Sequence, residues 1–141
     1  MRLVLDASAA IHTVTKSPFE DLLRNNINQS NAVIAPDLYY AEVSSGLLKY
    51  VKADLLDIKH ARERLAEASG LITKFHTVKE LRYEALLEAN RLNHSVYDIY
   101  YLILAKRYGA YLVSLDKRLL ALARQENLRY IQFEEIDWDW E

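Results

Sequence analysis

Two aspartates follow two short apolar segments, and this placement favours a shared site. Asp6 comes directly after residues 2–5, and Asp116 comes directly after residues 111–115. Both segments are suited to buried parallel strands, whose carboxyl ends meet at one edge of a sheet. Two carboxylates held close together repel each other unless a cation lies between them, so a divalent metal ion is the economical explanation. Each aspartate can equally serve as no more than the N-cap of the helix that follows it.

A third carboxylate, Asp98, lies inside a helix predicted over residues 97–108. Helical geometry places it on the face that carries Leu102 and Ala105. Burying an isolated charge there is strongly unfavourable, so the carboxylate should meet a metal ion, another cation or backbone donors. The alternative is a capping box in which Asp98 pairs with Ser95.

A fourth acid, Glu42, belongs to a predicted helix over residues 38–50. It shares a narrow polar stripe with Ser45, Gly46 and Lys49, while apolar residues occupy the opposite side of the helix. The spacing by itself favours a solvated face. The alternative is a cleft in which another part of the backbone closely approaches Gly46.

The elements that position these acids alternate between strand and helix. Besides the two segments above, weaker strand candidates lie at residues 32–35 and 130–133, and everything between the strands has a helical pattern. We predict helices capped by Asp37 and ending near Val51, over 57–69 with Gly70 as a left-handed terminator, over about 78–92, over 96–108 with a Ser95 cap and a Gly109 terminator, and over about 119–125. This alternation predicts an α/β domain with a mainly parallel central sheet.

Composition narrows the chemistry without identifying the substrate. The 141 residues suit one domain spanning 1–141, and they include no cysteine, which excludes disulfides and thiolate chemistry. No apolar run approaches the length of a membrane span, so a cytoplasmic location is the default expectation. The net charge of −2 counts mildly against a nucleic-acid substrate, although cations held by carboxylates would supply a local positive field.

Four short motifs, taken in order and spacing, resemble those of the PIN-domain family, and within it the VapC toxins of type II toxin-antitoxin pairs. They are Leu5 to Ile11, Pro36 to Glu42, Ser95 to Leu102 with Ala105, and Leu112 to Leu119. Two departures are small: Ser114 stands where the family often has Thr, and Ile99 replaces a residue that is commonly small. The resemblance spans nearly the whole chain.

The resemblance implies a three-layer PIN-like fold with four to five short strands and about seven helices. It also implies a metal-dependent endoribonuclease in which one or two Mg²⁺ or Mn²⁺ ions activate water for attack on the RNA phosphodiester. The ions would be held by Asp6, Glu42, Asp98 and Asp116, with Ser8 and Ser114 orienting ligands, and Lys49, Lys117 and Arg118 contacting RNA phosphates. By analogy we expect a VapB-type antitoxin partner and a homodimer.

Three other functions fit parts of the sequence. A non-catalytic PIN-like module that binds RNA or protein differs from the enzyme by lacking metal binding. A metal-dependent DNA nuclease would use the same acids, since no reader of the RNA 2′-hydroxyl is evident. A phosphoacceptor or phosphatase domain commonly needs a second acid two residues after the first, where this chain has Ser8. The four histidines, at 12, 60, 76 and 94, lack metal-like spacing and are interpreted as structural or surface residues, and we assign no function to the acidic segment 134–141.

Overall fold

Four parallel strands form the centre of the computed structural model, which describes residues 1–133. Their order across the sheet is β3-β2-β1-β4, and all three neighbouring pairs are parallel. The strands are β1 (Arg2–Leu5), β2 (Ala32–Pro36), β3 (Lys74–His76) and β4 (Tyr111–Val113). The predicted mainly parallel sheet is therefore confirmed, with β1 and β4 side by side as the placement of Asp6 and Asp116 requires.

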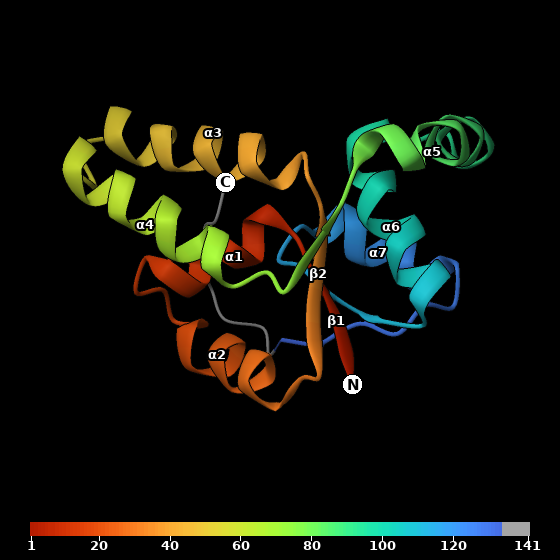
Figure 1. The fold of residues 1–141 in the computed structure, drawn as a ribbon, viewed down its shortest axis with the longest axis horizontal. Coiled ribbons are helices and arrows are strands. Elements are labelled where there is room, and N and C mark those ends of the chain that lie inside the picture. The colour runs from red at the N-terminus through yellow and green to blue at the C-terminus, as the bar shows by residue number, and fades with distance from the viewer. Residues whose placement is uncertain (134–141) are drawn as a thin grey trace.

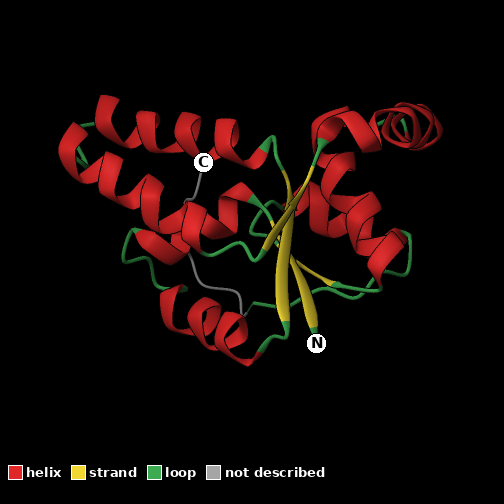
Figure 2. Cartoon of the chain, viewed as in Figure 1, coloured by secondary structure: helices red, strands yellow, loops and turns green. Residues whose placement is uncertain are grey.

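Helices cover both faces of this sheet (Figure 1). On one face lie α1 (Ala7–Val14), α2 (Glu20–Gln29), α3 (Tyr39–Lys52) and α4 (Ile58–Gly70), and on the other lie α5 (Val78–Leu92), α6 (Val96–Tyr108) and α7 (Lys117–Gln125). Figure 2 shows the resulting order of helix, sheet and helix. The described part of the chain thus has the three layers and seven helices that were expected. None of the helices within residues 1–133 has the length and apolar character needed to cross a membrane.

The core lies between the sheet and the helices, and α6 is its most deeply placed helix. Leu102, Ile103 and Leu104 are three consecutive residues of α6, and all are fully buried, so the middle of this helix has no wide solvent-exposed face. It packs against β1, β2 and β4. This packing fixes the position of the first turn of α6, which carries Asp98, relative to the sheet.

The strands differ from the prediction at three places. Residues 74–76 form β3, although no strand was predicted in that part of the chain, because a strand of three residues is too short to show a period of two. Residues 130–133 form no full strand and contribute a single parallel bridge from Tyr130 to Leu112. The predicted strand over 111–115 ends earlier, at Val113.

Two of the predicted caps were wrong. The Asp37 side chain does not cap α3 but accepts a hydrogen bond of 2.9 Å from the Val78 backbone N–H, at the start of α5. Gly70 is the last residue of α4 and has no left-handed conformation, whereas Gly109 has a φ of 59° and ends α6 as predicted. The helix over 78–92 matches its prediction. The acidic segment 134–141 lies outside the described residues.

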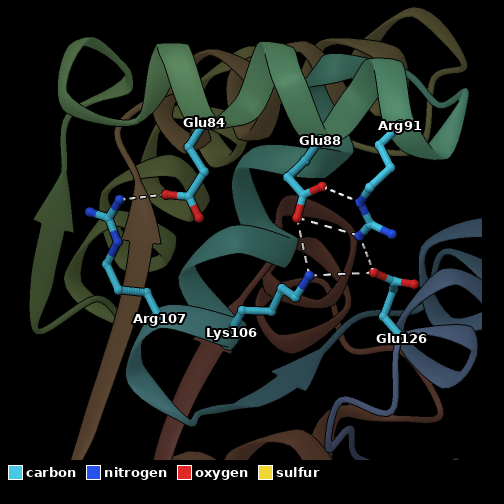
Figure 3. A network of polar contacts seen from close by, with 6 residues as sticks. All are labelled: Glu84, Glu88, Arg91, Lys106, Arg107 and Glu126. Atoms are coloured by element: carbon cyan, nitrogen blue, oxygen red, sulfur yellow. Dashed lines mark hydrogen bonds and ion pairs between the residues drawn. The ribbon is translucent and has the colours of Figure 1, made fainter.

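A network of ion pairs joins the three helices of the second face (Figure 3). Arg107 of α6 pairs with Glu84 of α5 at 2.6 Å. Lys106 of α6 lies 3.2 Å from Glu88 of α5 and 3.3 Å from Glu126, which directly follows α7. Arg91 contacts the same two glutamates. Single surface ion pairs contribute little, but a shared network restrains the relative positions of α5, α6 and the end of α7.

The two helix-terminal glycines provide a matched test of this backbone. Gly109→Ala is expected to lower the free energy of unfolding by about 1 kcal/mol, because a Cβ is disfavoured at positive φ. Gly70→Ala is expected to be neutral or mildly stabilising, since its backbone is helical and a Cβ there would meet no atom within 4 Å. Urea denaturation of the two variants measures the difference, and equal stabilities would contradict it.

Candidate active site

Asp6 lies at the junction of β1 and α1, where the sheet's carboxyl edge meets the first helix. Its side chain is 5 % exposed. One carboxylate oxygen accepts hydrogen bonds from the Ala9 N–H at 3.0 Å and the Ser8 hydroxyl at 2.7 Å. The other accepts from the Ser114 hydroxyl at 2.5 Å. The aspartate therefore caps α1, as one interpretation of the sequence proposed, and is also held from the neighbouring strand's end.

Ser8 and Ser114 link the ends of β1 and β4 through Asp6. The Ser8 hydroxyl accepts a hydrogen bond of 3.0 Å from the Leu115 N–H, and the Ser114 hydroxyl accepts one of 3.0 Å from the Asp116 N–H. Because each hydroxyl donates to Asp6 and accepts from the chain beyond β4, the two serines fix the position of one carboxylate relative to the next. Both residues thus contact Asp6 directly.

Asp116 begins α7 and is the second acid at this edge. One of its carboxylate oxygens accepts hydrogen bonds from the Arg118 N–H at 2.9 Å and the Leu119 N–H at 3.4 Å, so it caps the helix. The Asp6 N–H donates to the Val113 carbonyl oxygen at 3.1 Å, which ties the two strand ends together. Capping and membership of a shared site are therefore compatible for both aspartates.

Glu42 faces the same pocket as Asp6 and Asp116. The sequence analysis favoured a solvated face for Glu42, and that interpretation was wrong. Its carboxylate accepts a hydrogen bond of 2.7 Å from the Tyr101 hydroxyl. Close packing explains the rest of the stripe: a Cβ built on Gly46 would lie 2.1 Å from the Cδ1 atom of Ile11. Glycine at this position allows α3 to approach α1, and the stripe faces a cleft between these two helices.

Asp98 is half-buried in the first turn of α6. Its Oδ2 atom lies 3.7 Å from the Nδ1 atom of His94, one turn earlier. Ser95 is the N-cap by backbone position, but its side chain makes no capping hydrogen bond. The capping-box alternative for Asp98 is therefore absent, and the carboxylate is turned towards the cleft.

A single pocket of about 670 Å³ brings the four acids together. It follows α1 and α3 from the edge of the sheet outward. Several residues that the sequence analysis discussed line this pocket: Asp6, Ser8, Glu42, Ser45, Gly46, Lys49, Asp98 and Asp116. Ser114 reaches the site from behind Asp6 and is fully buried. Residues separated by up to 110 positions in the chain thus line one cavity.

Burial and mutual repulsion raise the pKa values of three of these acids. Desolvation raises the pKa of Asp6 to about 6, opposed by its three hydrogen bonds and reinforced by the charge of Asp116. Desolvation likewise raises the pKa of Glu42 to about 7, with the charges of the other three acids adding to the effect. The pKa of Asp98 is also raised, first by burial and then by the charge of Asp116. The site therefore holds more negative charge than its surroundings stabilise.

The carboxylate oxygens of the four acids are suitable ligands for a hard divalent cation, but they are not close enough together to coordinate one ion. Carboxylate oxygens are the ligands that Mg²⁺ and Mn²⁺ prefer. Within residues 1–133, however, no group of three or more His, Cys, Asp or Glu side chains is close enough together to hold a metal ion. Asp6, Glu42 and Asp116 instead accept hydrogen bonds from hydroxyl or backbone donors, and Asp98 lies beside His94.

The three basic residues predicted to contact RNA occupy different places. Lys49 lines the pocket on α3. Lys117 and Arg118 are exposed at the start of α7 and are not among the lining residues. The charge of Arg118 nevertheless acts on Asp98, whose pKa it lowers slightly against the larger effect of burial.

Tyr101, His12 and Lys16 line the pocket but were not predicted as site residues. Tyr101 lies three residues after Asp98 on the same helical face, a spacing that could have indicated a shared environment. His12 is buried beside Phe19, with the ring centroids 5.7 Å apart, and burial lowers its pKa. No sequence pattern distinguishes Lys16, which follows α1, from an ordinary surface lysine.

Comparison with known proteins places this geometry in a family. The PIN-domain family model matches residues 3–132. The chain belongs to the PIN-domain family. The VapC-type resemblance agrees with this: the chain is 29% identical over 121 residues to a protein named Ribonuclease VapC3 from Pyrobaculum aerophilum, covering 84% of this chain and 92% of that protein.

A solved structure supports the same fold. The crystal structure of PAE2754 from Pyrobaculum aerophilum matches with a TM-score of 0.67 and 22% sequence identity, covering 86% of this chain and 78% of that one. The PIN-like fold predicted from the four motifs is therefore confirmed.

The raised pKa values of Asp6 and Glu42 predict that this PIN domain becomes less stable as the pH rises. The folded protein keeps protons on Asp6 up to about pH 6 and on Glu42 up to about pH 7, whereas the unfolded chain loses them near the ordinary pKa values of 3.8 and 4.5. The contribution of these two carboxyl groups to the free energy of unfolding is fully present below their pKa values in the unfolded chain. It is lost as the pH rises through their pKa values in the folded protein.

Urea denaturation in EDTA is expected to give a lower midpoint near pH 8 than near pH 5. Glu42→Gln keeps an oxygen that accepts from Tyr101 but cannot ionise, so its midpoint should fall less between these pH values. A midpoint that rises with pH in the wild type, or an identical fall in Glu42→Gln, would contradict this explanation.

Proposed function

We propose that this PIN domain is a metal-dependent endoribonuclease of the VapC type, with residues 1–141 as a single domain. The observation that carries the proposal is the convergence of Asp6, Glu42, Asp98 and Asp116 on one pocket. Membership of the PIN-domain family and the name of the relative Ribonuclease VapC3 support the reaction class. The raised pKa values support a role in cation binding, because a divalent ion would relieve the repulsion among these acids.

The four acids would hold one or two Mg²⁺ or Mn²⁺ ions. A bound ion of this kind supplies Lewis acidity, which makes water a stronger nucleophile and offsets negative charge that develops on the phosphate. The protein's own part is to keep the carboxylates oriented. Ser8 and Ser114 hold Asp6, and Tyr101 holds Glu42.

No side-chain nucleophile is needed in this scheme. Ser8 and Ser114 are the hydroxyls that contact Asp6, and both are already engaged as donors to Asp6 and acceptors from backbone N–H groups. Their hydrogen bonds suit them to position a carboxylate. Hydrolysis by activated water is therefore the step that these residues support.

We also propose a VapB-type antitoxin partner, a homodimer and a cytoplasmic location, all by analogy with the family. The outer face of α5 offers a surface for a protein partner, since Tyr83, Leu86 and Leu87 are 70 %, 64 % and 70 % exposed. These residues recur at helical spacing and so form one apolar face. Size-exclusion chromatography with light scattering measures whether the chain is dimeric.

Asp6→Asn and Asp98→Asn are each expected to reduce RNA cleavage to background while leaving the fold intact. For Asp6, the shift of the pKa from 3.8 to about 6 corresponds to roughly 3 kcal/mol of unfavourable ionisation. Asparagine has no such charge and can still cap α1, so the metal-free variant should be as stable as the wild type or more stable.

The measurement is incubation of the purified protein with structured RNAs and Mg²⁺ or Mn²⁺, beside an EDTA control. Single-stranded and duplex DNA of matching sequence are included, because the same acids could hydrolyse DNA. Cleavage that persists in both variants, or in EDTA, contradicts the proposal, and cleavage of DNA alone would make the chain a DNA nuclease.

Ser114→Ala is expected to lower the cleavage rate by about 10- to 100-fold, in the range for residues that orient metal ligands. The variant removes one hydrogen bond to Asp6 and the acceptor for the Asp116 N–H, so both acids lose a restraint. Ser114→Thr, which restores a hydroxyl, should recover activity. Equal rates in wild type and Ser114→Ala would show that this hydroxyl does not position the acids.

A further inference from the structure

Helix α7 begins directly after Asp116 and exposes a face that carries positive charge. Its buried residues, Leu119, Leu122 and Ala123, pack towards the core. The exposed positions recur at helical spacing on the opposite side of the helix: Lys117, Arg118, Ala121, Arg124 and Gln125. Three of these five side chains are cationic, and no residue of α7 is acidic. The exposed side of this helix therefore presents charge of one sign.

The positive surface continues beyond the end of α7. Asn127 has a φ of 58°, and after this left-handed turn the chain returns to β4. There the Arg129 carbonyl oxygen accepts a hydrogen bond of 2.9 Å from the Leu112 N–H. The Arg129 guanidinium group lies 5.3 Å from the centre of the Tyr111 ring, which restrains the side chain. This arginine is therefore placed at the edge of the sheet with its charge exposed.

One acid lies close to this surface in the sequence, but its charge is compensated elsewhere. Glu126 is the only acid of residues 117–133, and it contacts the basic residues of α5 and α6 that Figure 3 draws. Within the described part of the chain, Arg124 and Arg129 by contrast take part in no ion pair, and both are exposed. These two arginines are therefore available to an anion, although the whole chain has a net charge of −2.

Arg118 connects this surface with the four acids. Its N–H donates to the Asp116 carboxylate at 2.9 Å, and its positive charge lowers the pKa of Asp98 against the larger effect of burial. Arg124 follows six residues later, which is about 9 Å along the helix at about 1.5 Å per residue. Because the chain then rejoins β4, Arg118, Arg124 and Arg129 form a row that leads away from the acid pocket.

We propose that Arg124 and Arg129 bind phosphates of the RNA beyond the scissile phosphodiester, so that one flank of the substrate follows the exposed side of α7 away from the acids. This inference rests on the proposed ribonuclease function. Contacts of this kind supply affinity without reading the base sequence. The surface therefore favours RNA that extends several nucleotides beyond the cut on one side.

Two features favour an RNA backbone over an acidic protein segment. Separate cations along a row match the repeated charges of a phosphate backbone, and the planar guanidinium group binds phosphate oxygens in pairs. The exposed positions of α7 include no large apolar side chain, whereas the centre of a protein interface is usually apolar. Phosphates are therefore the anions that this surface suits best.

The test compares double variants in an Asp98→Asn background, in which the RNA should stay intact. Arg124→Gln with Arg129→Gln, the α7 variant, removes both charges. The control, Arg62→Gln with Arg82→Gln, gives the same net charge by removing one exposed helical arginine and one arginine that lies over a tyrosine ring. Arg124→Lys with Arg129→Lys keeps both charges. Fluorescence anisotropy in Mg²⁺ measures the affinity of each variant for a labelled single-stranded RNA of about 20 nucleotides, and urea denaturation checks that each is folded.

Each lost phosphate contact should reduce the slope of log K against log salt by about 0.7, or about 1.4 for both. The parent should therefore lose about sevenfold more affinity than the α7 variant between 50 and 200 mM salt. The control and the lysine variant should match the parent. In the chain with Asp98 restored, the α7 variant should raise KM for the cleaved RNA several-fold and leave kcat unchanged.

An α7 variant with the salt dependence and KM of the control overturns the inference, as does a folded lysine variant that does not recover RNA binding. A polyglutamate peptide is titrated in parallel, and loss of peptide binding with unchanged RNA binding would assign the surface to an acidic protein partner instead. Failure of the proposed function gives a different result, in which the arginines govern RNA binding but the wild type cleaves no RNA.

Discussion

Desolvation of carboxylates at one recessed edge of the sheet is the constraint on which the site depends. Asp6, Glu42 and Asp98 all have pKa values raised chiefly by burial, and the repulsion of neighbouring acids adds to the effect. Such an arrangement is unfavourable for the folded protein without a cation. It persists because hydroxyl and backbone donors compensate part of the charge, and because the surrounding layers leave these side chains little freedom to move apart.

The three layers supply that restraint from different directions. The hydroxyls of Ser8 and Ser114 connect the ends of two neighbouring strands through Asp6. Helix α6, whose middle turns are buried, carries both Asp98 and Tyr101, and the Tyr101 hydroxyl reaches across to Glu42 on α3. The ion pairs between α5, α6 and the end of α7 hold α6 from the outside. Stability and site geometry thus depend on the same contacts.

The sequence predicted those features that local patterns encode. The positions of Asp6 and Asp116 after apolar strands placed them at one edge, and Gly109 marked a helix end correctly. Glu42 shows what local patterns cannot predict. The polar stripe of α3 to which it belongs has the same pattern as a solvated face, and only the contact of Ile11 with Gly46 shows that it faces another helix. Asp37 was misassigned for a similar reason, because the Val78 N–H that it binds lies about 40 residues away, whereas β3 was missed because it is only three residues long.

The order of the strands determines when during synthesis the pocket can form. β1 is the first strand along the described residues, yet it lies between β2 and β4, and the Ser114 that binds Asp6 is separated from it by 108 residues. Contacts at such sequence separation form late in folding. A chain still emerging from the ribosome carries Asp6 without its partner strand, so nascent fragments lack the assembled acids until most of the polypeptide has been translated.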